Sequence, residues 1–126
     1  FDGIIHLGDG QSDAKWLEKE TGVQVQFVAG NCDLCRDCPR ELRQTVDGVR
    51  LLAVHGDKYN VKLELTTLSY YAEEACAQAA LFGHTHQPFA GYVGRVLLVN
   101  PGSLAQGRYA ELRLDHGQAV PFLKEF

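Results

Sequence analysis

The sequence predicts a mixed α/β domain, and three observations support this fold class. First, an apolar run over 3–7, a helical segment capped by Ser12 and a strand-like run over 23–29 follow one another. This order is expected to form a right-handed parallel crossover. Second, Asp47-Gly48 lies between the strand-like segments 43–46 and 49–55 and predicts a β-hairpin. Third, the last third of the chain alternates strand-like segments with turns, which is typical of antiparallel sheet.

The remaining elements follow from helical spacing and from glycine. Gly22 is expected to end the first helix, and a short strand is expected over 80–82. We predict a long second helix that Asn60 caps and that carries one apolar stripe, made of Val61, Leu65, Leu68, Ala72, Ala75, Cys76 and Ala79. We expect turns at Gly91, at Gly94 and at His116-Gly117.

The composition indicates one soluble domain over residues 1–126. Hydrophobic residues make up 45% and charged residues 22%, so the chain can form a core. The net charge of -4 comes without a run of Lys or Arg, which argues against long nucleic acid as a partner. No apolar run approaches the roughly 20 residues of a membrane helix, and the first residues do not resemble a signal peptide.

The four cysteines do not form a secreted disulfide framework. Cys32, Cys35 and Cys38 are close in sequence, whereas Cys76 lies alone in a helical segment. The first three imitate the spacing of an iron–sulfur or zinc ligand run, but a loop with reduced thiols is the favoured interpretation. We therefore expect a cytoplasmic protein.

Four segments show the same pattern: an apolar strand ends at a glycine, and the residue beside that glycine has a side chain that can bind metal. They are Gly8-Asp9, Gly30-Asn31, His55-Gly56 and Gly83-His84-Thr85-His86. Loops that follow parallel strands gather at one edge of a sheet, so these side chains can converge. A single Asp or His of this kind is more often a turn residue or a hydrogen-bonded core residue. The joint pattern favours ligands.

The donor set indicates the metal and the chemistry. One carboxylate, one amide oxygen and three imidazoles suit manganese, iron, cobalt or zinc better than calcium. The Asp9 carboxylate has two oxygens and can bridge two ions. Two ions about 3.5–4 Å apart acidify a bridging water into a hydroxide nucleophile and neutralise charge on a phosphoryl group. We therefore expect a two-metal phosphoesterase.

The ordered motifs GD, GNCD, HGD and GHTH, followed by NPGS over 100–103, resemble those of the calcineurin-like metallophosphoesterases. The resemblance is to their small YfcE-like phosphodiesterases and implies a four-layer α/β/β/α sandwich. It implies that Asp9 bridges both metals, that Asn31, His55 and His84 complete one site, and that His86 binds the other. The implied cofactors are two divalent transition metal ions, manganese first, with iron, zinc, nickel or cobalt as alternatives.

The resemblance implies an enzyme that hydrolyses a small phosphate ester, with Asp9, Asn31 and Cys32 in the catalytic site. Cys32 takes the position where larger relatives have a histidine that assists the leaving group, which weakens the case for a general acid. Arg108 is a candidate for substrate binding. A homo-oligomer is compatible with these expectations.

The sequence departs from the family pattern at one place, and two rival hypotheses stay open. The family begins with a strand ending in Asp-x-His, and this sequence begins at Phe1 without it, so we expect an N-terminally incomplete domain. One rival is a catalytically silent interaction scaffold of the same fold, like the retromer subunit. The other is a mononuclear metal-binding domain. Retention of ligand types in every other motif favours the enzyme.

Overall fold

The structure is a computed structural model that describes residues 3–8, 11–30, 39–59 and 61–125. In chain order its helices and strands are β1 (Ile4–His6), α1 (Gln11–Thr21), β2 (Val25–Phe27), β3 (Glu41–Val46), β4 (Val49–Val54), η1 (Asp57–Tyr59), α2 (Thr66–Glu74), β5 (Ala79–Leu81), β6 (Phe89–Val93), β7 (Val96–Asn100), η2 (Leu104–Gln106), β8 (Arg108–Asp115) and β9 (Gln118–Glu125).

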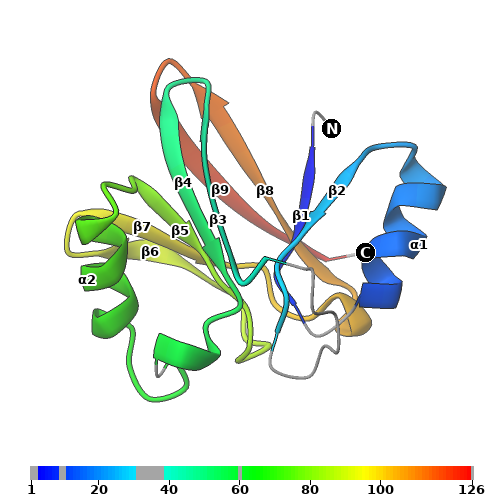
Figure 1. Ribbon diagram of the computed structural model, residues 1–126, viewed down its shortest axis with the longest axis horizontal. Helices are drawn as coiled ribbons and strands as arrows, with labels where there is room; N and C mark the ends of the chain where they lie inside the picture. The colour runs from blue at the N-terminus through cyan, green and yellow to red at the C-terminus, as the bar shows by residue number, and fades with distance from the viewer. Residues whose placement is uncertain (1–2, 9–10, 31–38, 60, 126) are drawn as a thin grey trace.

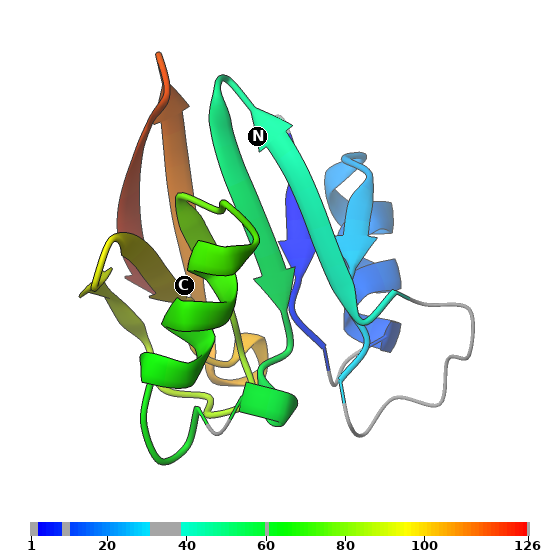
Figure 2. The ribbon, with the colours of Figure 1, turned by 60° about the vertical axis from the view of Figure 1, so that its left-hand side comes forward.

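The strands form three sheets, and the two helices lie on the outside (Figure 1). The central sheet has five strands in the order β3-β4-β5-β7-β6, while β1-β2 and β8-β9 are separate pairs. Helix α1 packs beside β1 and β2, and α2 covers one face of the five-stranded sheet (Figure 2). The predicted mixed α/β fold class is confirmed.

The first crossover is formed as the sequence predicts. β1 and β2 pair in parallel, with Ile4 opposite Val25 and His6 opposite Phe27. The second strand is shorter than the predicted run over 23–29, because the backbone changes partners at both ends. The N–H of Val25 donates to the Glu18 carboxylate at 3.1 Å, and the N–H of Ala29 donates to the carbonyl of Pro39 at 2.8 Å.

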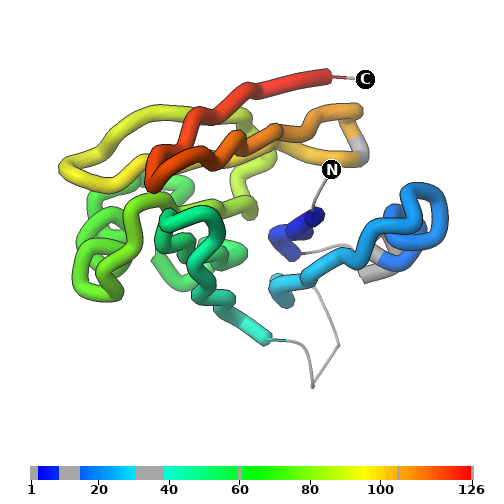
Figure 3. The backbone as a smooth tube through the Cα atoms, turned by 90° about the horizontal axis from the view of Figure 1, so that it is seen from above, coloured from blue at the N-terminus to red at the C-terminus, as the bar shows by residue number. Residues whose placement is uncertain are grey.

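The five-stranded sheet is buried on both faces, which gives the molecule two apolar clusters. One face packs against α2, with Leu52, Leu68, Phe82 and Leu98 almost fully buried. The opposite face packs against the β8-β9 pair, which Figure 3 shows lying over the sheet on the side away from α2. Strands β4 and β7 are buried along nearly their whole length, as central strands of a covered sheet should be.

Two hairpins have the turns that the sequence predicts. At Asp47-Gly48 the φ angles are 49° and 81°, and at His116-Gly117 they are 49° and 79°. Positive φ at both central residues is the geometry of a tight turn that matches the twist of the strands. The N–H of Gly117 donates to the carbonyl of Asp47 at 2.9 Å, so the tips of the two hairpins contact each other.

The predicted long second helix is wrong in its extent. The helix α2 covers only Thr66–Glu74, Ala79 belongs to β5, and Asn60 lies outside the described residues. The Glu64 carboxylate accepts from the N–H of Thr66 at 2.8 Å and so satisfies a free amide at the start of the helix. Cys76 has φ of 60°, which ends the helix early. Apolar residues therefore recur at helical spacing beyond the end of α2 because they are buried on both faces of the sheet, not because the helix continues.

The predicted turn at Gly91 is also wrong. Gly91 lies inside β6 and pairs with Leu98, and the turn follows at Gly94 with φ of 63°. Within the parts of the chain that the structure describes, no helix has the length and apolar character needed to span a membrane.

Candidate metal centre

The carboxyl ends of β1, β4 and β5 point to the same side of the molecule (Figure 1). Each strand is followed by one of the glycine motifs: Gly8 comes two residues after β1, His55 directly follows β4, and Gly83 comes two residues after β5. β4 and β5 are parallel neighbours in the central sheet. The topology therefore brings three separate motifs to one edge.

The glycines bring these motifs into contact. A Cβ placed on Gly8 would lie 2.6 Å from Nδ1 of His55 and 2.7 Å from the backbone N of Gly30. A Cβ on Gly83 would lie 3.2 Å from the carbonyl oxygen of Leu7. The residues that precede Asp9, Asn31 and His84 in the sequence therefore meet around His55. Asp9 and Asn31 themselves lie outside the described residues.

His55 is buried, with 2% of its surface exposed, and one hydrogen bond selects its tautomer. Its Nδ1 lies 2.6 Å from the carbonyl oxygen of Leu7. A carbonyl can only accept, so Nδ1 carries the proton and donates it. In the neutral ring Nε2 then has a lone pair, the form in which imidazole binds metal, and a carbonyl partner of this kind is common for metal-binding histidines.

The distance between His55 and His84 fits two ligands of one ion. His55 Nε2 lies 3.1 Å from His84 Nδ1, and the rings meet edge to face. Two nitrogens that each lie about 2.1 Å from one ion, at about 90° to each other, are about 3.0 Å apart. Without metal the same distance is a hydrogen bond in which His84 Nδ1–H donates to His55. The observed geometry accommodates either state.

The loop that carries His84 has an unusual backbone and is tied to its surroundings. His84 and His86 have φ of 68° and 61°, the left-handed region that side chains rarely adopt. The N–H of Gly83 donates to the carbonyl of His55 at 2.9 Å. Strain of this kind persists where surrounding contacts hold it, and it is frequent at functional sites.

Asn100 supplies much of this support, a role that its place in the NPGS motif did not predict. Its side chain is fully buried at the end of β7. Its Nδ2 donates to the carbonyl of Gly83 at 3.3 Å and to the hydroxyl of Thr85 at 2.9 Å, and its Oδ1 accepts from the N–H of Gly102 at 2.9 Å. Asn100 therefore links the NPGS turn to the GHTH loop. The available signal was a polar residue at the end of an apolar strand.

The other predicted site residues are placed less closely. His86 is exposed, and among the described residues no contact joins it to the pair formed by His55 and His84. Cys32 lies outside the described residues. Arg108 begins β8, with Nε 3.7 Å from the carboxylate of Glu125, and its stem packs against Gly102. Within the described ranges, no group of three or more His, Cys, Asp and Glu side chains is close enough to hold a metal.

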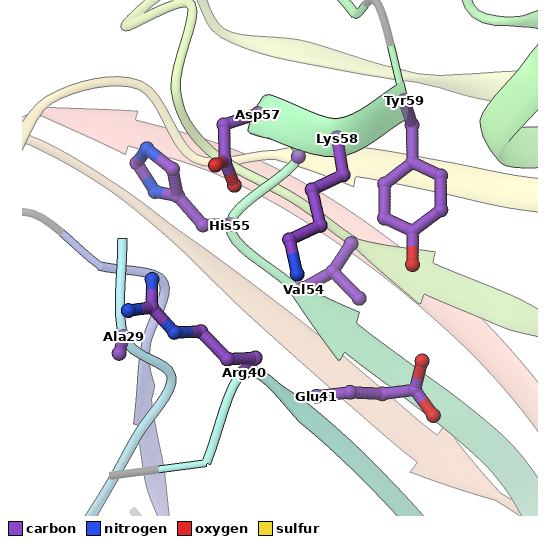
Figure 4. Close-up of a pocket in the computed structure, with 9 residues that line it drawn as sticks. Ala29, Arg40, Glu41, Val54, His55, Asp57, Lys58 and Tyr59 are labelled. Atoms are coloured by element: carbon purple, nitrogen blue, oxygen red, sulfur yellow. The ribbon is translucent and has the colours of Figure 1, made fainter. Parts of the chain in front are cut away.

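A cavity of about 150 Å³ opens beside His55 (Figure 4). The segments after β2 and before β3 form one wall, and β4 with η1 forms the other. Its lining residues are Ala29, Arg40, Glu41, Val54, His55, Gly56, Asp57, Lys58 and Tyr59. The cavity therefore reaches His55, one member of the histidine pair, and carries charged side chains of both signs.

Tyr59 closes the end of this cavity away from His55. Its ring lies 5.0 Å from that of Tyr71, centroid to centroid. Burial, with a smaller effect of Tyr71, raises the pKa of Tyr59 to about 12. Tyr71 in turn donates its hydroxyl proton to the Glu41 carboxylate, which also accepts from Nε of Arg43 at 2.6 Å.

Known proteins are similar to this chain in both sequence and fold. Residues 1–114 match the model of the calcineurin-like phosphoesterase superfamily domain. A probable metallophosphoesterase of Bacillus subtilis, YsnB, is 32% identical over 125 residues, covering 94% of this chain and 72% of the relative. A predicted phosphoesterase of Streptococcus pneumoniae with a crystal structure is 27% identical, with a TM-score of 0.82 over 98% of this chain and 74% of that one.

The fold is also similar to that of Vps29, a protein whose name is not that of a phosphoesterase. A crystal structure of a single-mutant Vps29 from Entamoeba histolytica matches with a TM-score of 0.78, over all of this chain and 83% of that one, at 15% identity. That identity supports likeness of fold alone. The family model covers 114 residues and agrees with the motifs that meet around His55. The chain therefore belongs to the calcineurin-like phosphoesterase superfamily.

Proposed function

We propose that this protein is a metal-dependent phosphoesterase that hydrolyses phosphodiester bonds of a small substrate. The observation that supports this most directly is the pair formed by His55 Nε2 and His84 Nδ1, 3.1 Å apart, with the His55 tautomer set by Leu7. This separation is compatible with two ligands of one ion, and the pair lies at the sheet edge where three motifs meet. Two divalent ions would supply an acidified water and neutralise charge on the phosphoryl group.

In this proposal each metal-binding residue has a separate role. His55, His84 and Asn31 would hold one ion, His86 the other, and Asp9 would bridge them. Burial of His55 excludes water from one side of the site, and its bond to Leu7 keeps Nε2 directed at the ion. Manganese is the first choice of metal. Cys32 would stand beside the leaving group, where a thiol is a poorer proton donor than the imidazolium of a histidine at neutral pH.

The proposal is tested by removing one nitrogen from His55. In His55→Asn the amide nitrogen can take the place of Nδ1 and keep the hydrogen bond to Leu7, whereas the atom equivalent to Nε2 is gone. We expect Mn²⁺ affinity to fall at least about 10-fold and manganese-dependent hydrolysis of bis-p-nitrophenyl phosphate to be abolished. His116→Asn makes the same change at an exposed turn and is expected to alter neither.

The rival proposals predict different results from the same material. A catalytically silent scaffold of the same fold would show no manganese-dependent turnover, in the wild type as in the variant. A mononuclear binding domain would take up one ion per chain at saturation by elemental analysis, where we expect two. Either result with correctly folded wild-type protein would overturn the proposed activity.

A further inference from the structure

We infer that the cavity beside His55 binds a second anionic group of the substrate, held by Arg40 and Lys58. The substrate class would then be phosphodiesters that carry a carboxylate or a further phosphate beyond the bond that is cleaved. This inference rests on the proposed function and adds the recognition of the substrate to it.

Arg40 is fixed at the mouth of the cavity. One of its terminal nitrogens donates to the carbonyl of Gly30 at 3.0 Å, and the preceding carbonyl of Pro39 accepts from the N–H of Ala29. This bond holds the guanidinium directly beside the motif that contains Asn31. Figure 4 shows the guanidinium directed toward the side of the cavity where His55 lies. Its remaining N–H groups make no hydrogen bond or ion pair to another described residue.

Lys58 adds a second positive charge from the opposite wall. It is the middle residue of η1, and Figure 4 shows its ammonium group between Arg40 and Val54. Across the described part of the chain Lys58 has no ion pair and no hydrogen bond from its side chain. Among the described lining residues that Figure 4 labels, no carboxylate lies between these two cations, so an anion bound there would meet both charges.

The acidic residues of the lining do not neutralise this pair. Glu41 is engaged at the far end, where its carboxylate accepts from Arg43 and from the hydroxyl of Tyr71. In Figure 4 its oxygens lie below Tyr59, away from Arg40. Asp57 lies at the other end, beside the ring of His55. Among the described lining residues, the charged groups in the middle of the cavity are therefore those of Arg40 and Lys58.

The size of the cavity agrees with a small oxyanion. Its volume of about 150 Å³ is several times the roughly 30 Å³ that one water molecule takes up in the liquid. A planar guanidinium binds carboxylate or phosphate oxygens in pairs, and the nearby ammonium provides a further donor. Because His55 lines the same cavity, an anion held there lies one short spacer from the scissile group.

The test uses two substrates that differ in one charge. The first is 4-carboxyphenyl 4-nitrophenyl phosphate, and the second is its 4-carbamoylphenyl analogue, which keeps the phosphodiester charge and lacks the carboxylate; both release p-nitrophenolate. We expect kcat/KM to be about 10-fold higher for the carboxylate, mainly through KM, the scale of one charge-assisted hydrogen bond. In the double variant Arg40→Gln/Lys58→Gln the ratio should fall to about 1, while the carbamoyl substrate is still cleaved. Lys62→Gln removes one charge from an exposed turn and should keep the preference.

A binding measurement separates this inference from the proposed function. Titration calorimetry on the manganese-loaded protein would compare 4-carboxyphenylphosphonate with 4-carbamoylphenylphosphonate. Tighter binding of the carboxylate that is lost in the double variant would support the anion site even if neither substrate is turned over, a result that would overturn only the phosphodiesterase. Turnover of both substrates at equal kcat/KM, with equal binding of both phosphonates, would overturn the anion site and leave the phosphodiesterase intact.

Discussion

At the scale of single residues, the candidate site depends on how closely the backbone can approach His55. Gly8 has φ of 102°, and the position of its missing side chain is taken up by Nδ1 of His55 and by the backbone of Gly30. The same nitrogen of His55 must also reach Leu7 at 2.6 Å. A side chain at position 8 would displace either the imidazole or the strand end before Asn31.

Gly8→Ala is therefore expected to be destabilising for two reasons. The left-handed backbone conformation costs about 1–2 kcal/mol for a residue with a side chain, and the clash with backbone atoms adds about 1–3 kcal/mol more. The matched control is Gly22→Ala, where φ is 70° but nothing lies within 4 Å of the added carbon. Urea unfolding should show the larger loss in Gly8→Ala. Equal losses in both variants would show that the contact with His55 does not constrain the site.

At the scale of elements, the histidines lie on loops whose conformation neighbouring strands maintain. The GHTH loop leaves β5 with positive φ at both histidines, and the end of β7 holds it through Asn100. The NPGS turn is held by the same side chain. Conformations that are unfavourable in isolation are therefore stabilised by hydrogen bonds between segments far apart in the sequence.

Replacing Asn100 tests this support. Asn100→Ala removes hydrogen bonds to Gly83, Thr85 and Gly102 inside a buried site, and we expect a loss of about 2–4 kcal/mol in the free energy of unfolding. Thr85→Val removes only one of these partners and should cost about 1 kcal/mol. Manganese affinity is expected to fall in Asn100→Ala, because His84 loses its placement. Unchanged affinity in a folded Asn100→Ala protein would contradict the positioning role.

At the scale of the whole molecule, packing of distant segments changes the chemistry of individual groups. Tyr59 belongs to η1 and Tyr71 to α2, while Glu41 and Arg43 come from β3. The tertiary structure gathers these four side chains at one end of the cavity. Burial there stabilises the neutral phenol of Tyr59 and raises its pKa to about 12 from a usual value near 10.

This shift predicts how stability depends on pH in the alkaline range. Below about pH 10 both states keep the proton on Tyr59, and the contribution of its burial is complete. Between about pH 10 and 12 the unfolded chain releases that proton while the folded chain retains it, so stability falls as pH rises. Tyr59→Phe is expected to flatten this part of the curve in urea unfolding. Tyr92→Phe, at an exposed strand position, supplies the same chemical change as control, and identical curves for Tyr59→Phe and wild type would contradict the prediction.

Local sequence predicted the strand ends and hairpin turns well, because glycine and Asp-Gly act through the backbone of their own neighbours. Gly8, Gly30 and Gly83 do stand at strand ends, and the turns at Asp47-Gly48 and His116-Gly117 have the expected geometry. The extent of the second helix was wrong because burial on either face of a sheet can continue a helical pattern of apolar residues. The assignments of Asp9, Asn31, Cys32, His86 and Arg108 stay predictions.

The sequence by itself determined the fold class, the family and the set of residues able to bind metal, since these depend on residue types and on their order. Only the tertiary structure decided that Nε2 of His55 faces Nδ1 of His84 and that Asn100 holds the loop that carries His84. It also decided that Arg40 and Lys58 face one cavity. These relations join residues 15 to 29 positions apart, and their distances are set by how the sheets and helices pack.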